Sequence, residues 1–99
     1  MFIIEKTTEF DRWLRKLNDL TAKAKILFRI QKLEKDEHFG DWKPVGEGIK
    51  ELKINYAKGC RVYFSEKDGK IIILLIGGDK STQQNDIQKA KEIWSKLKK

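Results

Sequence analysis

The sequence contains few of the residues that form disulfides, metal sites or tight backbone restraints: one cysteine, one histidine and one proline in 99 residues. The lone cysteine, Cys60, cannot form a disulfide within the chain, which favours a reducing compartment and predicts a cytoplasmic protein. His38 has no cysteine or second histidine near it, so no metal site is predicted. Gly77-Gly78 lacks the spacing of a phosphate-binding or dinucleotide-binding loop, and no cofactor is expected.

Long hydrophobic runs are also absent. The apolar stretch Ile71–Ile76 is far shorter than the roughly 18 residues of a membrane span. The apolar run that follows Met1 is too short for a signal peptide, so neither secretion nor a membrane partner is expected. A length of 99 residues is that of one ordinary domain, and we predict a single domain over residues 1–99.

Charge, by contrast, is abundant and uneven. Lysine and arginine number 22 against 15 acidic residues, a formal net charge of +7. Residues 1–50 contain 11 basic and 9 acidic residues, whereas residues 51–99 contain 11 and 6. A basic excess of this kind suits a polyanion, which includes nucleic acid, an acidic protein and a membrane surface.

Helical periodicity appears at both ends of the chain. Apolar residues recur at a spacing of three and four after Thr7-Thr8 and again after Leu20-Thr21, which predicts two short helices in a hairpin. A last helix is predicted from Ser81, which can form a capping box with Gln84. The apolar positions of these three helices are Phe10, Trp13, Leu14 and Leu17; Ile26, Leu27, Ile30 and Leu33; and Ile87, Ala90, Ile93, Trp94 and Leu97.

Strands are predicted elsewhere. Phe2–Glu5 forms the first, residues 51–55 and 60–65 alternate between apolar and polar, and Ile71–Ile76 is apolar throughout. Residues 39–48 contain the proline and three glycines, and we interpret them as an ordered loop. The expected fold is α+β, a small antiparallel sheet with an N-terminal helical hairpin and a C-terminal helix, in the order β-α-α-β-β-β-α.

The two predicted hairpins indicate which residues share a face. A turn about Ala57 places Lys53 opposite Arg61 on the face away from the core, and a two-residue Asp68-Gly69 turn sets the next register. The core-face pairs are then Leu52 with Val62, Ile54 with Cys60, Phe64 with Ile73 and Val62 with Leu75. The opposite face pairs Glu51 with Tyr63, Lys53 with Arg61, Tyr63 with Leu74 and Arg61 with Ile76, and its Ile72, Leu74 and Ile76 need a cover from residues 82–98.

Lys53 opposite Arg61 is unusual, because like charges directly across a ladder destabilise a sheet. One interpretation is an anion site that Lys80 completes, with Tyr63 beside it. The alternative is a solvated polar face, and the register alone favours neither interpretation over the other.

Two segments of the sequence resemble the addiction-module killer (HigB-like) branch of the RelE/ParE toxin superfamily: "GDWKPVGEGIKELKINYAKGCRVYF" and "GGDKSTQQNDIQKAKEIW". The most specific parts are Glu51-Leu52-Lys53, Gly59-x-Arg61-Val62-Tyr63, and Gly77-Gly78-Asp79-Lys80 with Gln83, Asp86, Ala90 and Trp94 at fixed offsets. The resemblance implies a toxin with a partner antitoxin, expected to carry a helix-turn-helix DNA-binding domain. For RelE-like members it implies metal-independent cleavage of messenger RNA on the ribosome.

That reaction requires a proton acceptor for the attacking 2′-hydroxyl, cations for the phosphoryl oxygens and an acid for the leaving oxygen. Arg61 is the expected phosphate clamp, because its planar fork can hold two oxygens. Gly78 leaves room for a phosphate, and Trp42 beside Lys43 can stack a base. The candidate catalytic residues are Lys53, Arg61, Lys80, Glu51 and Tyr63, with Lys53 or Glu51 as base, and the candidate substrate-binding residues are Gly78, Trp42 and Lys43.

One departure from the nuclease pattern leaves other functions open. No histidine, tyrosine or phenylalanine follows Phe64, whereas several nuclease members place such a residue near the C-terminus. Two alternatives to an endoribonuclease therefore remain: a ParE-like toxin that poisons DNA gyrase by binding, and a basic nucleic-acid-binding domain without enzymatic activity.

Overall fold

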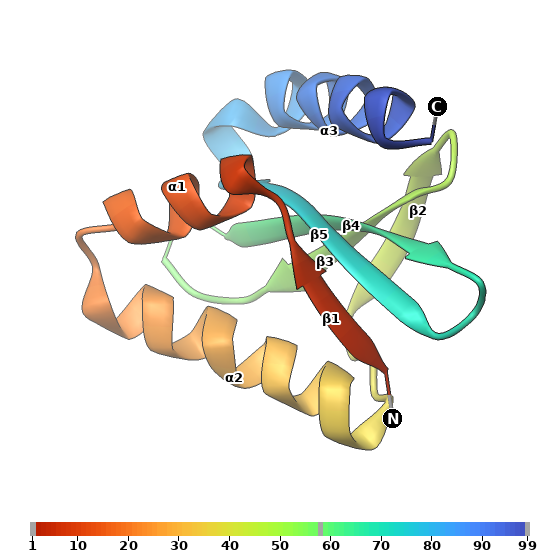
Figure 1. Ribbon diagram of the computed structural model, residues 1–99. Helices are drawn as coiled ribbons and strands as arrows, with labels where there is room; N and C mark the ends of the chain where they lie inside the picture. The colour runs from red at the N-terminus through yellow and green to blue at the C-terminus, as the bar shows by residue number, and fades with distance from the viewer. Residues whose placement is uncertain (1, 58, 99) are drawn as a thin grey trace.

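The computed structural model describes residues 2–57 and 59–98 and confirms an α+β fold (Figure 1). Figure 1 shows the helical hairpin of α1 and α2 and the C-terminal helix α3 arranged around a twisted sheet. The elements in chain order are β1 (Ile3–Lys6), α1 (Thr8–Lys16), α2 (Leu20–Asp36), β2 (Trp42–Gly46), β3 (Ile49–Ile54), β4 (Cys60–Lys67), β5 (Ile71–Gly78), the short 3-10 helix η1 (Lys80–Thr82) and α3 (Gln83–Leu97). None of the described helices combines the length and the apolar character needed to cross a membrane.

The sheet differs from the prediction at both edges. Its strand order is β1-β5-β4-β3-β2, and β1 runs parallel to β5 while the remaining pairs are antiparallel. The strand β2 lies within the segment 39–48 that the sequence predicted as a loop, so that prediction is wrong. Pro44 has no amide hydrogen to donate, but an edge strand tolerates this, and the β2–β3 register shifts between Pro44 and Gly46.

The register of the first predicted hairpin is confirmed. Leu52 pairs with Val62, and Lys53 pairs with Arg61 across β3 and β4. Glu51 pairs with Tyr63 on the same face as Lys53 and Arg61.

The predicted register of β4 with β5 is wrong. Lys67 pairs with Ile71, so the connecting loop contains three residues, and Asp68 and Gly69 both have positive φ angles, of 58° and 69°. A second shift between Tyr63 and Phe64 brings Arg61 opposite Gly78 instead of Ile76. Phe64 therefore pairs with Leu74, not Ile73, and Val62 with Gly77, not Leu75. Since side chains alternate along a strand, the offset exchanges the faces of β5 over part of its length.

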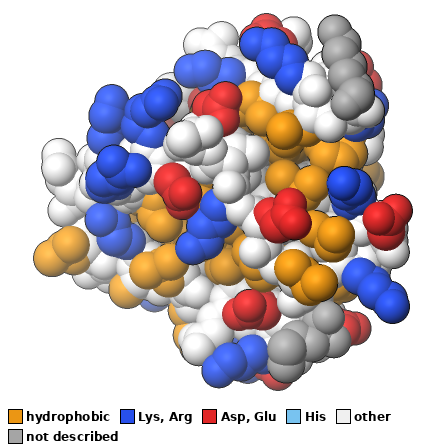
Figure 2. Space-filling view, in the orientation of Figure 1, with side chains coloured by type: hydrophobic (Ala, Val, Ile, Leu, Met, Phe, Trp, Pro, Cys, Tyr) orange, Lys and Arg blue, Asp and Glu red, His pale blue; other side chains and the backbone are white. Residues whose placement is uncertain are grey.

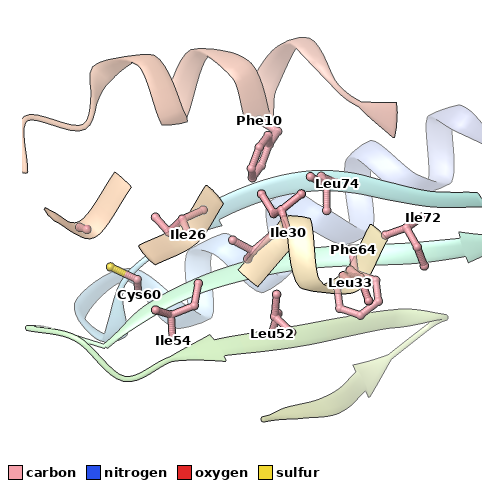
Figure 3. Packing of buried hydrophobic residues seen from close by; sticks show 12 residues of the cluster. Phe10, Ile26, Ile30, Leu33, Leu52, Ile54, Cys60, Phe64, Ile72 and Leu74 are labelled. Carbon is pink, nitrogen blue, oxygen red and sulfur yellow. The ribbon is translucent and has the colours of Figure 1, made fainter. Parts of the chain in front are cut away.

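One face of the sheet packs against α1 and α2. Phe10 of α1 and Ile26, Ile30 and Leu33 of α2 meet Leu52, Val62, Phe64, Ile72 and Leu74 of the strands, all buried (Figure 3). Ile72 and Leu74 were predicted on the opposite face. Thr7 caps α1 by accepting a hydrogen bond from the Phe10 amide, and Asp19 caps α2 through the amides of Thr21 and Ala22.

The other face packs against α3. Ala90 and Ile93 of α3 bury Ile49, Tyr63, Ile73, Leu75 and Ile76. The predicted cap of this helix is wrong, because α3 follows Thr82, whose side chain makes no capping hydrogen bond. The Ser81 amide instead donates to Asp79 at 2.8 Å, and Asp79 caps η1. The predicted stripe of α3 also ends early, since Leu97 is 51% exposed.

Candidate functional site

A small pocket opens beside the α3 face of the sheet, where β2, β3 and β4 lie next to one another. Its volume is about 150 Å³. Five of the predicted site residues line it together with Asp41: Trp42, Lys43, Glu51, Lys53 and Arg61. The structure therefore brings together side chains from β2, β3 and β4. The predicted register had linked only those of β3 and β4.

Glu51 is the buried centre of this site, with an exposed fraction of 1%. Its Oε2 accepts hydrogen bonds from the Tyr63 hydroxyl at 3.1 Å and from Gln83 Nε2 at 2.9 Å. Its Oε1 lies 3.6 Å from Arg61 Nε and 3.9 Å from Lys43 Nζ. Both carboxylate oxygens are thus engaged, and the geometry makes Glu51 an anchor for its neighbours. Its predicted role as a base stays a prediction.

Arg61 is buried to 6% exposure, which corrects the expectation that it lies on an open face. Its Nη1 donates to the Gly59 carbonyl at 2.6 Å, and its Nε has no hydrogen-bond partner in the described part of the chain. A buried donor without a partner is energetically unfavourable unless a ligand or water supplies the acceptor. Arg61 also lines the pocket, so an anion that enters there would lie close to a buried positive charge.

Tyr63 is fully buried, although the sequence placed it beside the cationic patch. Burial, followed by the negative charge of Glu51, raises the pKa of its hydroxyl. The hydroxyl donates to Glu51, so Tyr63 holds the carboxylate from beneath the site. It is not among the residues that line the pocket.

Lys80 and Gly78 lie outside the pocket lining, at the start of the segment that leads to α3. Lys80 is exposed, as predicted. A Cβ placed on Gly59 would lie 3.0 Å from Arg61 Nη1 and 3.9 Å from Lys80 Cβ, so Lys80 lies next to the turn that holds the guanidinium. The space beside Gly78 is filled by the Asp86 carboxylate, which corrects the expectation that this glycine leaves room for a phosphate.

Lys53 owes its position to a residue that the sequence analysis missed. Arg29 of α2 donates to the Lys53 carbonyl at 2.7 Å and to the Phe39 carbonyl at 2.8 Å. The Lys53 amide donates to the Asp41 carbonyl at 2.9 Å. Arg29 therefore ties the end of β3 to the segment before β2. The helical spacing of the residues around Arg29 does not predict this role.

Trp42 and Lys43 occupy successive positions of β2, and their side chains differ in surroundings. Trp42 is 41% exposed and lies 5.8 Å from the ring of Phe39, centroid to centroid. The Lys43 side chain is 62% exposed, and its Nζ approaches Glu51. Both therefore reach solvent at the mouth of the pocket, which is compatible with the predicted contact to a nucleotide.

Gln83 and Asp86 connect α3 to the site. Gln83 donates to Glu51, and the Thr82 hydroxyl donates to Asp86. Burial raises the pKa of Asp86, and the Thr82 hydrogen bond opposes this shift. Both residues belong to the motif on which the family resemblance was based, but their contacts were not predicted.

The arrangement of sheet, hairpin and C-terminal helix is that of the RelE toxins. The structure superposes on the toxin–antitoxin complex RelBE of E. coli with a TM-score of 0.66 and 15% identity, covering 80% of this chain and 96% of that one. For the isolated E. coli RelE toxin the TM-score is 0.65 at 13% identity, with 89% and 97% covered. For the RelBE2 complex of Mycobacterium tuberculosis it is 0.61 at 18% identity, with 80% and 98% covered.

The sequence gives the narrower assignment. Residues 12–95 match the family described as "Phage derived protein Gp49-like (DUF891)", and the chain belongs to this family, which is part of the RelE/ParE-like toxin superfamily. A Haemophilus influenzae protein described only as uncharacterized is 50% identical over 94 residues, which span 95% of this chain and 94% of that protein. The HigB-like branch stays a prediction.

Proposed function

We propose that the protein is the toxin of a toxin–antitoxin pair and that it cleaves messenger RNA on the ribosome without a metal ion. The observation that carries this proposal is Arg61, a buried arginine that lines a pocket with Lys53 and Lys43 and whose Nε, 3.6 Å from Glu51 Oε1, makes no hydrogen bond among the described residues. The RelE fold and the family assignment support the same function.

In the proposed reaction the substrate's 2′-hydroxyl gives its proton to Lys53 or Glu51, the predicted bases, and attacks the adjacent phosphorus to form a 2′,3′-cyclic phosphate. The bond between phosphorus and the 5′-oxygen of the next nucleotide breaks, and this oxygen leaves as a hydroxyl after taking a proton from solvent. Arg61 binds the phosphoryl oxygens, and Lys53 adds positive charge as negative charge accumulates on them. Glu51 keeps the guanidinium in place before substrate arrives, and Tyr63 and Gln83 in turn hold Glu51, which reduces the reorganisation that binding requires. Trp42 and Lys43 contact the neighbouring nucleotide at the pocket mouth.

The partner is proposed to be a cognate antitoxin with a helix-turn-helix domain. The solved RelE relatives from E. coli and M. tuberculosis include complexes described as toxin with antitoxin. An antitoxin that covers the pocket or displaces α3 would block the site, because Gln83 at the start of α3 contacts Glu51 directly.

The test is induced expression of the wild type and of Lys53→Ala, followed by growth measurement and by primer extension on cellular messenger RNA. Lys53 is half-buried and its side chain forms no ion pair with the described residues, so the variant should fold while growth arrest and cleavage fall by at least about tenfold. Lys67→Ala, an exposed lysine farther along the sheet, is the matched control and should keep full toxicity. A folded Lys53→Ala protein with full cleavage would contradict the proposal.

Lys80 is proposed to contact RNA phosphate outside the pocket. Because it is exposed, its contribution is electrostatic and screened by salt. Lys80→Ala should weaken binding to ribosomes and reduce the dependence of that binding on salt concentration, with little change in the melting temperature. Equal binding by both proteins at every salt concentration would remove Lys80 from the site.

A second candidate function is supported by the burial of Tyr63. With that hydroxyl under Glu51, none of the described residues that line the pocket is a tyrosine or histidine that could act as an acid, and a ParE-like toxin that binds DNA gyrase needs none. The same expression experiment separates the two functions. A nuclease stops translation first, whereas a gyrase poison causes DNA damage before protein synthesis falls.

A further inference from the structure

The outward face of α2 exposes hydrophobic side chains. Leu20 is 76% exposed, Phe28 56% and Leu27 42%. Together with Ala24, which is also exposed, they are spaced by four, seven and eight residues and therefore share one side of the helix. The opposite side of α2 carries its buried residues. Figure 2 shows orange side chains at the surface over the first half of α2, next to blue ones.

The surface on both sides of Phe28 is hollowed. One hollow of about 520 Å³ lies between α2 and the end of β3 and is lined by Phe28, Ala24 and Ile54 among others. A second, of about 400 Å³, is lined by Phe28, Lys32 and His38 among others. Phe28 thus forms a ridge between two grooves, which is the relief that accepts the side chains of a second helix.

The two hollows differ in charge. Lys25 and Arg29 line the first, and none of the other described residues around it is charged, whereas the second is lined by Arg29 and Lys32 together with Asp36 and Asp41. The helix contains Lys23, Lys25, Arg29, Lys32 and Lys35 against Glu34 and Asp36. Lys32 Nζ lies 5.8 Å from the Phe28 ring centroid, and Lys25 lines the first hollow. An occupant must therefore combine hydrophobic side chains with negative charge on the side that meets the first hollow.

We propose that this outward face of α2 is the docking surface for an acidic amphipathic helix of a partner protein. Apolar residues spaced by four and seven are typical of helices that pack along one another through a groove. The lysines beside these residues favour a partner helix with negative charge. The proposal rests on the proposed function only for the source of that helix, which is the antitoxin.

Two other occupants fit less well. A second copy of the chain would bring the lysines of one α2 against those of the other, which opposes association. A membrane surface is flat and would leave the two hollows beside Phe28 unfilled.

The test is fluorescence anisotropy of a labelled synthetic helical peptide with the full chain. The peptide has the 17-residue length of α2, leucines on one face and glutamates and alanines elsewhere. Phe28→Ser and Lys25→Glu should each weaken its binding by about tenfold or more. Leu97→Ser changes a residue of similar exposure on α3 and should alter binding by less than about twofold. A peptide with lysine in place of glutamate should not bind.

Several results would overturn the proposal: no binding of the acidic peptide, equal binding to the Phe28→Ser protein, or a loss caused by Leu97→Ser instead. Phe28-dependent binding to phosphatidylglycerol vesicles without peptide binding would assign the face to a membrane, and Phe28-dependent self-association in place of peptide binding would assign it to a second copy. If peptide binding depends on Phe28 and Lys25 as expected but the protein cleaves no RNA, the docking surface stands and only the proposed function is rejected.

Discussion

The two faces of the sheet are held together by different physical means. On the α1 and α2 face, Leu52, Val62 and Phe64 are buried among aliphatic and aromatic side chains from both helices. On the α3 face, Glu51, Arg61 and Tyr63 occupy the alternate positions of the same two strands and are equally buried. The first face is stabilised by the apolar area that it buries and by close packing. The second is stabilised by specific hydrogen bonds and ion pairs.

This difference determines how each face responds to change. Hydrophobic packing is not directional, so a core tolerates a swap that conserves volume. A buried carboxylate tolerates far less, because each oxygen needs its donors and its charge needs a cation. The proposed function lies on the second face, because groups that are to bind an anion must be charged and oriented at the same time.

The largest expected effect comes from Glu51→Gln. The substitution keeps the shape of the side chain but leaves the buried Arg61 guanidinium without its carboxylate partner, and should lower the free energy of unfolding by about 3 kcal/mol or more. Leu52→Met, at the adjacent position on the other face, should cost less than about 1.5 kcal/mol. Urea unfolding measures both, and comparable losses would show that the two faces do not differ in this respect.

Next in size is the pair Gly77→Ala and Gly78→Ala. An added methyl group at Gly77 meets the ring of Trp13, which is fixed in the packing of α1, whereas one at Gly78 meets the end of the Asp86 side chain. We expect a loss of about 2–3 kcal/mol at Gly77 and about 1 kcal/mol at Gly78, because a carboxylate can rotate away more easily than an indole. A greater loss at Gly78 would mean that Asp86 is held as rigidly as Trp13.

The same contrast explains which features were predictable from sequence. The period of three to four in α1 and α2, and the alternation along β3 and β4, follow directly from burial, and they placed Lys53 opposite Arg61 correctly. The strand β2 was missed because Pro44 and three glycines are typical of a loop, and its pairing at an edge depends on β3. The register of β5 failed because Ile71–Ile76 is apolar at every position, so no alternation could reveal the three-residue turn.

Within the site, sequence reasoning found the charged residues but not their surroundings. Glu51, Lys53 and Arg61 were chosen because the predicted register put them on the same face of two paired strands. The structure places all three at one pocket. Their burial was not predicted, since it depends on α3 and on Gln83 at its start. The role of Arg29 depends on carbonyl groups at the end of β3 and near Asp41, which no residue pattern encodes.

A moderate effect is expected for Tyr63→Phe. Loss of the hydroxyl leaves Glu51 Oε2 with Gln83 as its remaining hydrogen-bond donor, and should lower the free energy of unfolding by about 1–2 kcal/mol. RNA cleavage by the folded variant should remain close to wild type, because the hydroxyl supports the site from beneath. Abolished cleavage at unchanged stability would instead give Tyr63 the chemical role that the sequence analysis assigned to it.

The smallest expected effect concerns Asp86, whose carboxylate lies over Gly78 and accepts a hydrogen bond from Thr82. Burial raises the pKa of Asp86 in the folded protein above its value of about 3.9 in an unfolded chain. Folding therefore disfavours the charged form, and this penalty appears as pH rises from the unfolded pKa through the folded one. Asn at this position carries no charge and keeps an oxygen for Thr82.

Asp86→Asn should consequently raise the melting temperature at pH 7, by an amount equivalent to at most about 1 kcal/mol given its partial exposure. The gain should shrink as the pH is lowered toward 4, where the wild-type carboxyl becomes protonated in the folded state. Thermal melts of both proteins at pH 7 and pH 4 measure this difference. A gain of equal size at both pH values would show that the effect comes from packing against Gly78 and not from the buried charge.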